Sequence, residues 1–278
     1  MTERINLDKY DLIQTKSTSS KGNQQKWLIG SQWYKADHMG YEALCEVVIS
    51  KLLKLTNVSD FVTYQPVKIE FSERVMNGCC SENFKHKDES IITLERLARQ
   101  WLAKSITTEL LNYPSAEEKI KFTVDFVESV THMKDIGKYF SMMLTLDAFF
   151  LNEDRHTHNI AFILNDITGK YKLCPYFDFG LSLLADTTED YPLDEDVFTL
   201  IRKVKSKPFS SDFDEQADAA QKLYGPQLEL SFTRHDVENV LDNISEYYDQ
   251  RIIERVRIIL FEQMKRYQYL FKKQCSRQ

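Results

Sequence analysis

Between Ala148 and Leu184 the chain reads AFFLNEDRHTHNIAFILNDITGKYKLCPYFDFGLSLL, where polar residues interrupt apolar runs that are typical of a protein core. Three aspartates, two histidines and three asparagines lie in this stretch. Burying a polar group costs free energy unless the group is paired. So much polarity among core-forming residues therefore needs a physical reason, and the spacing of the residues supplies one.

A β-hairpin is predicted inside this stretch. Two strand-like runs, IAFIL from Ile160 and KYKLCPYF from Lys170, flank NDITG, whose Asn, Asp and Gly residues are typical of turns. A hairpin brings its outer ends together, so Asp154, Asn159 and Asp178 should converge. Carboxylates gathered with an amide repel one another unless a cation or a proton lies among them. Oxygen ligands of this kind suit Mg²⁺, which keeps some of its waters and shares substrate phosphates.

The order of these residues resembles a known family. DRHTHN, followed by a hairpin and DFG, resembles the D-R-H-x-x-N and DFG motifs of phosphoinositide-kinase-like catalytic lobes. It is still more similar to the HipA-like bacterial protein kinases, including the short CtkA type. Protein kinases proper carry H-R-D-x-x-x-x-N, with the histidine before the aspartate. The resemblance implies an α+β, bilobal, protein-kinase-like fold with a small β-rich N-lobe, a larger and mostly helical C-lobe, and ATP-dependent phosphoryl transfer.

The resemblance also implies roles for single residues. Asp154 would accept the proton of the acceptor hydroxyl, while Asn159 and Asp178 would hold Mg²⁺ against the ATP phosphates. His156 would support the loop or touch the transferring phosphoryl group. The upstream WYKAD places Lys35 on the third strand, where a kinase lysine meets the α- and β-phosphates.

An acidic partner for Lys35 is expected on the following helix. Glu42 is the first choice for this ion pair, and Glu46, one turn later, is the second. The alternative is that Lys35 and Glu42 form only an exposed surface pair, which would contribute little to stability.

The segment where a glycine-rich loop would cover the phosphates reads TKSTSSKGNQQK. It contains the single glycine Gly22, so we expect the hydroxyls of Ser17 to Ser20, and Lys21 or Lys26, to supply part of the phosphate contact. HipA-like kinases phosphorylate a serine of this loop in their own chain, which makes Ser19 and Ser20 candidates for autophosphorylation. Otherwise they are ordinary loop residues.

A second hairpin is predicted in KWLIGSQWYKAD. If Gly30-Ser31 is a two-residue turn, Leu28 faces Trp33 and Lys26 faces Lys35. Like charges directly opposite each other are destabilising by up to about 1 kcal/mol. A bound polyphosphate would relieve that repulsion, and the alternative is that the two ammonium groups splay into solvent.

The remaining elements divide the chain near residue 90. Strand-like runs FVTYQPVKIEF and RVMNGCCSENF and the helical MGYEALCEVVISKLLKL come before it. Amphipathic helices are predicted for ESIITLERLARQWLA, AEEKIKFTVDFVESV and DIGKYFSMMLTLDAFFL, and long helices from about Asp236, where Thr233 and Asp236 form a capping pair. We expect an N-lobe at 1–88 that binds nucleotide and a helical C-lobe at 89–278 that carries the catalytic loop and DFG.

Composition limits the possible functions. Hydrophobic residues make up 42% of the 278 residues and charged residues 28%, which is ordinary for a globular protein. The net charge of -6 argues against specific nucleic-acid binding. The sequence shows neither a run of about 18 apolar residues nor an N-terminal signal peptide, so we expect a cytoplasmic protein without a transmembrane segment. The five cysteines lack paired metal-ligand spacing, which indicates free thiols.

Other interpretations of the motif residues stay open at this point. Asp154 and Asn159 could cap a helix after DAFFL. His156 and His158 could bind a transition metal with Asp154 and Asp178, as in a hydrolase.

Three functions fit the sequence. The leading one is a HipA-like protein serine/threonine kinase that uses ATP and Mg²⁺. The others are a small-molecule or lipid kinase on the same fold and a pseudokinase that binds nucleotide without turnover. We expect acceptor specificity to lie in the segment Ala185–Tyr224. The chain is shorter than full-length HipA toxins, which carry an extra N-terminal subdomain for partner contacts, so the resemblance does not extend to a toxin role.

Overall fold

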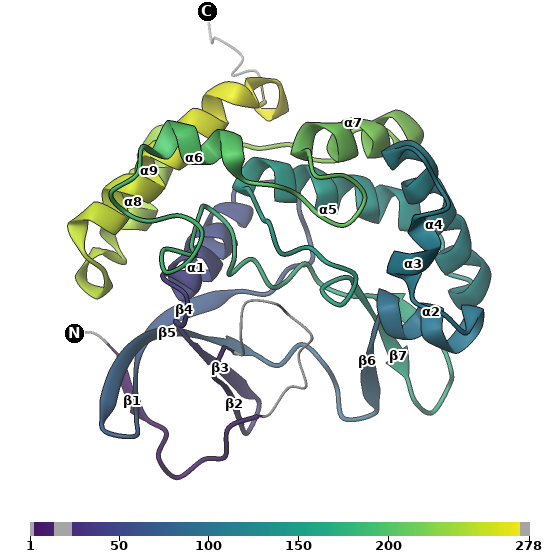
Figure 1. Ribbon diagram of the computed structural model, residues 1–278. Coiled ribbons are helices and arrows are strands. Elements are labelled where there is room, and N and C mark those ends of the chain that lie inside the picture. The colour runs from purple at the N-terminus through teal and green to yellow at the C-terminus, as the bar shows by residue number, and fades with distance from the viewer. Residues whose placement is uncertain (1–2, 14–23, 273–278) are drawn as a thin grey trace, which may run out of the picture. The chain divides into compact units, whose positions relative to one another are not determined.

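The computed structural model describes residues 3–13 and 24–272, which pack as two compact units (Figure 1). The first unit comprises residues 1–83, Phe177–Lys203 and Glu229–Gln278. The second unit comprises Phe84–Tyr176 and Val204–Leu228. Strands dominate the N-terminal part of the chain and helices the rest, which makes the fold α+β.

A five-stranded sheet forms the base of the first unit. Its strands in spatial order are β1 (Arg4–Asn6), β4 (Tyr64–Phe71), β5 (Arg74–Glu82), β3 (Gln32–Ala36) and β2 (Lys26–Ile29). β1 runs parallel to β4, and the other neighbouring strands are antiparallel. Pro66 lies in β4 before the pairing with β1 begins at Lys68, as expected of a residue that is confined to unpaired strand edges.

The β2–β3 hairpin has the predicted register. Leu28 faces Trp33 and Lys26 faces Lys35 across it. Gly30 occupies the first turn position with a φ of +58°, a left-handed conformation that glycine adopts at little cost. The turn residue therefore fixes which side chains of β3 face the interior.

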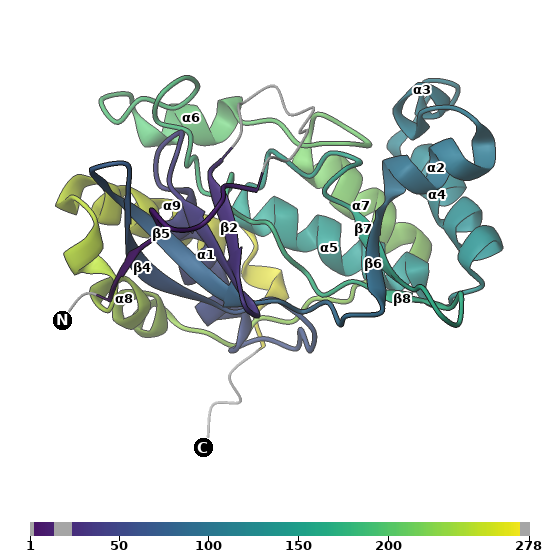
Figure 2. The same ribbon diagram turned by 90° about the horizontal axis from the view of Figure 1, so that it is seen from below.

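Helix α1 (Glu42–Leu53) packs against β4 and β5 (Figure 2). Leu44, Val48 and Leu52, which lie at helical spacing along α1, are fully buried. Nearly every other residue of α1 is buried as well, so α1 is a core helix and not an amphipathic surface helix.

Further helices complete the first unit. They are α6 (Val197–Lys203), α8 (Arg234–Asp242), α9 (Gln250–Arg266) and the 3-10 turns η1 (Ser245–Tyr247) and η2 (Gln268–Leu270). The predicted capping pair at the start of α8 is confirmed, because the Thr233 hydroxyl accepts the Asp236 N–H and the Asp236 carboxylate accepts the Thr233 N–H at 2.7 Å.

The second unit combines a three-stranded sheet with helices. Its strands are β6 (Glu89–Thr93), β7 (Ala161–Asn165) and β8 (Tyr171–Leu173). Its helices are α2 (Leu94–Leu102), α3 (Ile106–Leu110), α4 (Ala116–Thr131), α5 (Ile136–Phe150) and α7 (Phe213–Tyr224). The predicted hairpin is confirmed as β7 and β8, with Phe162 opposite Leu173 and Leu164 opposite Tyr171.

The helix predicted from Glu89 onward begins five residues later. Residues Glu89–Thr93 form strand β6 instead, because β-branched Ile91 and Ile92 pair with β7. Thr93 then caps α2, since its hydroxyl accepts the N–H of Arg96. The apolar spacing from Glu89 onward fits a helix. Only the pairing with β7, which lies much later in the chain, shows that the first five residues form a strand.

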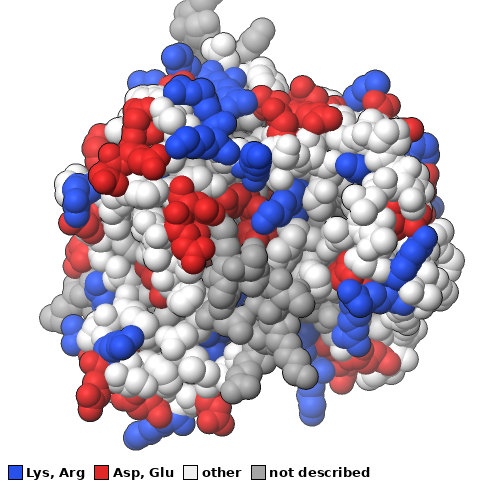
Figure 3. Space-filling view, viewed as in Figure 1, with Lys and Arg blue, Asp and Glu red and all other residues white. Residues whose placement is uncertain are grey.

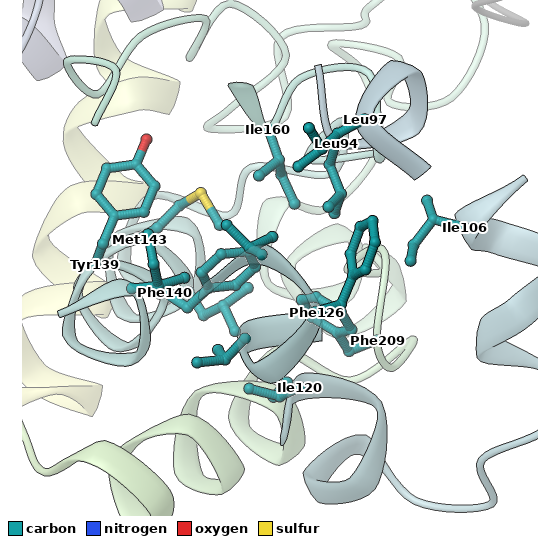
Figure 4. Packing of buried hydrophobic residues seen from close by; sticks show 14 of the residues in the cluster. Leu94, Leu97, Ile106, Ile120, Phe126, Tyr139, Phe140, Met143, Ile160 and Phe209 are labelled. Carbon is teal, nitrogen blue, oxygen red and sulfur yellow. The ribbon is translucent and has the colours of Figure 1, made fainter. Parts of the chain in front are cut away.

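Aromatic and aliphatic side chains from most of these elements form the core of the second unit (Figure 4). Phe140 of α5 is fully buried there, and its ring lies 6.0 Å from that of Phe209. Phe162 brings β7 into the same cluster. The core therefore joins α5, which precedes the DRHTHN loop, to the hairpin that follows it.

The predicted N-lobe (1–88) was defined by nucleotide binding and the C-lobe (89–278) by catalysis, and this division stays a prediction. The two compact units have different boundaries. Phe177–Lys203, which includes DFG, and Glu229–Gln278 belong with the N-terminal sheet.

Three general features accompany the fold. None of the helices within residues 3–13 and 24–272 is long and apolar enough to cross a membrane. Cys45, Cys79, Cys80 and Cys174 are free thiols, as predicted, and Cys275 lies outside the described residues. Cationic and anionic side chains are interspersed on the face shown in Figure 3.

Replacing Phe140 with Ala should lower the free energy of unfolding by about 3–5 kcal/mol, because it removes a fully buried ring and leaves a cavity. Chemical denaturation measures the change. Leu111→Ala is the control, because that side chain is 80% exposed and its loss should change stability by less than about 0.5 kcal/mol. Equal losses in the two variants would contradict the packing described here.

Candidate functional site

Lys35 lies at the centre of an ion-pair cluster in the first unit. Its Nζ atom is 2.6 Å from Oε1 of Glu46 and 2.8 Å from Oδ1 of Asp178. The side chains of Lys35, Glu46 and Asp178 are 10%, 1% and 22% exposed. β3 supplies the lysine, α1 the glutamate and the DFG segment the aspartate, so one cation joins three elements.

The charge of Lys35 is maintained by these carboxylates. Burial alone lowers the pKa of Lys35, but Asp178 and Glu46 outweigh it, and the pKa lies well above its ordinary value. The ammonium group is therefore charged at neutral pH. At Lys35, the repulsion predicted between Lys26 and Lys35 is offset by these two anions.

The first choice for the partner of Lys35 was wrong. Glu42 accepts the backbone N–H groups of His38, Met39 and Gly40, which precede α1, with a shortest distance of 2.6 Å. An acidic residue in the first helical turn is also favoured by the helix dipole. Glu46 forms the ion pair instead. Lys35 and Glu42 are both buried, so the alternative of an exposed surface pair is also wrong.

The DFG segment is held against α1. Phe179 donates its backbone N–H to Oε2 of Glu46 at 3.0 Å, while Asp178 has a φ of +62°. A Cβ atom on Gly180 would lie 3.3 Å from the Cβ atom of Glu42, tighter than most such contacts. Glycine at this position therefore lets the segment approach the helix closely.

Asp154 and Asn159 lie together in the second unit. The Nδ2 atom of Asn159 donates to the carbonyl of Asp154 at 2.9 Å and to its Oδ2 at 3.2 Å. His156 donates its backbone N–H to the same carbonyl at 2.7 Å. Helix α5 ends at Phe150 with Leu151 as its C-cap, and no helix begins at Asp154 or Asn159, so the capping alternative is wrong. A carboxylate and an amide therefore pair within one short loop.

A buried ion pair fixes this loop. Nε of Arg155 lies 3.0 Å from Oδ2 of Asp147, and Nη2 donates to Oδ1 at 3.1 Å. Asn152 donates to the same carboxylate at 2.8 Å, and Nη1 of Arg155 donates to the carbonyl of Asn159 at 3.0 Å. Burial raises the pKa of Asp147, and Arg155 acts in the opposite direction. Asp147 was not predicted, although an acidic residue within the apolar run LTLDAFFL indicates a buried charge that needs a partner.

A second anchor comes from α2. Oε2 of buried Glu95 accepts hydrogen bonds from the hydroxyls of Ser105 at 3.0 Å and Thr157 at 3.4 Å. The backbone N–H of Glu95 also donates to the carbonyl of Thr157 at 3.2 Å. Glu95 was not predicted, because only the β6–β7 pairing brings the start of α2 to the loop.

The histidines occupy the same loop. Nε2 of His156 lies 3.8 Å from Oδ2 of Asp154, and its ring lies 5.5 Å from that of His158. Burial, together with His156, lowers the pKa of His158. His156 therefore stands beside the carboxylate, and both its predicted role and the alternative transition-metal site stay predictions.

Three of the predicted phosphate-binding residues, Ser19, Ser20 and Gly22, lie outside the described residues. Among the other predicted site residues, Lys35 and Asp178 are in contact within the first unit. Asp154 and Asn159 are in contact within the second unit. The convergence of Asp178 with Asp154 and Asn159 stays a prediction.

Comparisons with known proteins support the fold. No family model matches the sequence, and no curated protein matches it. Among solved structures the chain is similar to that of the Helicobacter pylori proinflammatory kinase CtkA, with a TM-score of 0.65 over 94% of this chain and 95% of the other. The two sequences are 14% identical. The chain therefore has a kinase-like bilobal α+β fold, as predicted.

Replacing Arg155 with Ala should lower the free energy of unfolding at neutral pH by about 3–5 kcal/mol, because Asp147 is left buried without its cation. Without Arg155 the folded-state pKa of Asp147 rises further above the unfolded value. A carboxyl with a raised folded pKa loses stability as the pH rises through that pKa, so the deficit against wild type should shrink as the pH falls from about 7 toward 5.

Chemical denaturation across this pH range measures the effect. The double variant Asp147→Ala/Arg155→Ala is the control, because it lacks the titrating carboxyl, and its deficit should not shrink as the pH falls. A deficit in Arg155→Ala that likewise does not shrink as the pH falls would contradict the assignment of this ion pair.

Proposed function

We propose that this chain is an ATP-dependent phosphotransferase, a HipA-like protein serine/threonine kinase. The observation that carries the proposal is the contact of Lys35 with both Glu46 and the aspartate of DFG. A lysine held between a helix glutamate and the DFG aspartate has the residue types and the order that phosphoryl transfer uses. The kinase-like fold and the paired Asp154 and Asn159 support the same reaction.

The residues of the first unit suit Mg-ATP. The ammonium group of Lys35 is charged and would bind the α- and β-phosphates. Asp178 is the most exposed member of the cluster and offers carboxylate oxygens, the ligands that Mg²⁺ prefers. Asn159 would be the second metal ligand. Bound Mg²⁺ would supply charge neutralisation at the phosphates.

The residues of the second unit suit the acceptor. Asp154 would accept the proton of the acceptor hydroxyl while the hydroxyl oxygen bonds to the γ-phosphorus. The bond from the γ-phosphorus to the bridging oxygen then breaks, and ADP leaves. His156 would support the loop or touch the transferring phosphoryl group. The rigid anchoring of the loop through Arg155 limits the reorganisation that the step requires.

Further parts of the proposal rest on the sequence. Ser19, Ser20, Gly22 and Lys26 would cover the phosphates, and Ser19 or Ser20 would be phosphorylated by the chain itself. A cytoplasmic location is also part of the proposal. The net charge of -6 disfavours a lipid kinase that acts at anionic membranes, the second candidate. A pseudokinase has no need of the base Asp154.

Mass spectrometry after incubation with Mg-ATP tests the function. We expect phosphate on Ser19 or Ser20 of the wild type, and in Asp154→Asn a rate of transfer that is lower by about 10²–10⁴-fold, because the general base is lost. ATP affinity, measured by calorimetry, should stay within about threefold, because the base acts on the acceptor and not on the nucleotide. Wild-type transfer in this variant would refute the role of Asp154.

Asp178→Asn should weaken Mg-ATP binding by about tenfold or more, because it removes a metal ligand, and should affect ADP binding without Mg²⁺ much less. Calorimetry with and without the metal measures both. Asp166→Asn, in the exposed turn between β7 and β8, is the matched control and should leave both affinities unchanged. Equal losses with and without Mg²⁺ in Asp178→Asn would indicate a folding defect and not a lost metal ligand.

A further inference from the structure

The segment that follows α6 has an alternating pattern of burial in the second unit. Val204 and Ser206 are buried, whereas Lys205 and Lys207 are exposed. Alternation of this kind is typical of an extended backbone, whose successive side chains point to opposite sides. Lys205 and Lys207 therefore lie on one side of the segment, about 7 Å apart at their Cα atoms.

The backbone of this segment is fixed from its buried side. The side chain of Gln216, itself fully buried, donates to the carbonyl of Lys207 at 3.2 Å. The hydroxyl of Ser206 donates to the carbonyl of Ser210 at 2.8 Å. Lys119 donates to the carbonyl of Phe209 at 3.3 Å, and the Phe209 ring is buried in the core. The two lysines are thus presented by a backbone that is already ordered.

Lys207 points at the candidate base. Its Nζ atom lies 3.7 Å from Oδ1 of Asp154, within ion-pair distance but longer than a hydrogen bond. The Lys207 side chain is 44% exposed, so its ammonium protons can reach a further anion. Within the described part of the chain, Lys205 makes no ion pair. Lys205 and Lys207 therefore lie on one ordered segment, and Lys207 is next to Asp154, the carboxylate proposed to activate the acceptor.

We propose that Lys205 and Lys207 select an acidic peptide as the phosphate acceptor. The inference rests on the proposed function and names its substrate class. Carboxylates at alternate positions of an extended peptide lie on one side, at the same spacing as the two lysines. Their pairing with Lys205 and Lys207 places a neighbouring serine or threonine hydroxyl beside Asp154. The segment belongs to Ala185–Tyr224, where the sequence predicts acceptor specificity without showing its nature.

Three pools of serine peptides test the inference with the full chain and Mg-ATP. The second and fourth positions on one side of the serine, which are alternate positions of an extended peptide, carry Asp in the first pool, Ala in the second and Lys in the third. We expect kcat/KM to be about tenfold higher for the acidic pool than for the alanine pool. Lys205→Glu should reverse the order, so that the lysine pool becomes the better substrate while the KM for ATP is unchanged.

Lys170→Glu is the matched control, because it makes the same charge change at an exposed lysine next to the turn between β7 and β8. It should keep the wild-type preference. Lys207→Gln should raise the KM for the acidic pool. If it raises the KM for ATP instead and leaves the preference intact, Lys207 binds nucleotide and the inference fails.

Two outcomes separate this inference from the proposed function. Transfer to all three pools at equal rates would overturn the acidic acceptor and leave the kinase assignment standing. The absence of transfer to any peptide, together with the absence of phosphate on the chain itself, would overturn the kinase assignment and the inference with it.

Discussion

The buried charge of Lys35 constrains how three elements of the first unit pack. A lysine side chain that is only 10% exposed loses most of its hydration, which is tolerated when carboxylates replace the water. Glu46 and Asp178 do so from α1 and from the DFG segment. Because the compensation comes from elements far apart in the chain, it ties strand β3, helix α1 and the residues after Tyr176 into one packed unit.

A buried ion pair also stabilises the loop that carries Asp154 in the second unit. Arg155 and Asp147 are buried almost completely, and the guanidinium spans from the carboxylate to the carbonyl of Asn159. A point charge such as lysine could not make these divergent contacts from one planar group. Glu95 holds the other side of the loop through Thr157. Asp154 and Asn159 thus lie on a loop whose shape is set by buried charges on either side, which suits the catalytic role proposed for Asp154.

The lysines proposed to bind anions include a buried one in the first unit and exposed ones in the second. Lys35 is enclosed by carboxylates and remains charged because of them, whereas Lys205 and Lys207 are exposed on a segment whose backbone is fixed by Gln216. A chain with a net charge of -6 repels anions at long range, so anionic ligands must be attracted by local cations of this kind. The two kinds of lysine fit the two anions of the proposed reaction, the nucleotide and an acidic acceptor.

The sequence by itself determined the features of local structure that depend on residues close together in the chain. Turn residues and strand-like runs located both hairpins, glycine set the register that places Lys26 opposite Lys35, and Thr233 with Asp236 marked the start of α8. The order of DRHTHN, hairpin and DFG was enough to indicate the kinase-like fold.

Only the tertiary structure decided which charges pair and which segments pack together. Glu42 and Glu46 are equivalent by spacing, and the N–H groups before α1 take the first and leave the second for Lys35. Residues Glu89–Thr93 have helical spacing but become a strand because β7 offers a partner. Tertiary folding also forms the ion pairs of Asp147 with Arg155 and of Asp154 with Lys207. Local patterns fix local geometry, whereas a buried charge is paired by whatever the fold brings within a few ångströms of it.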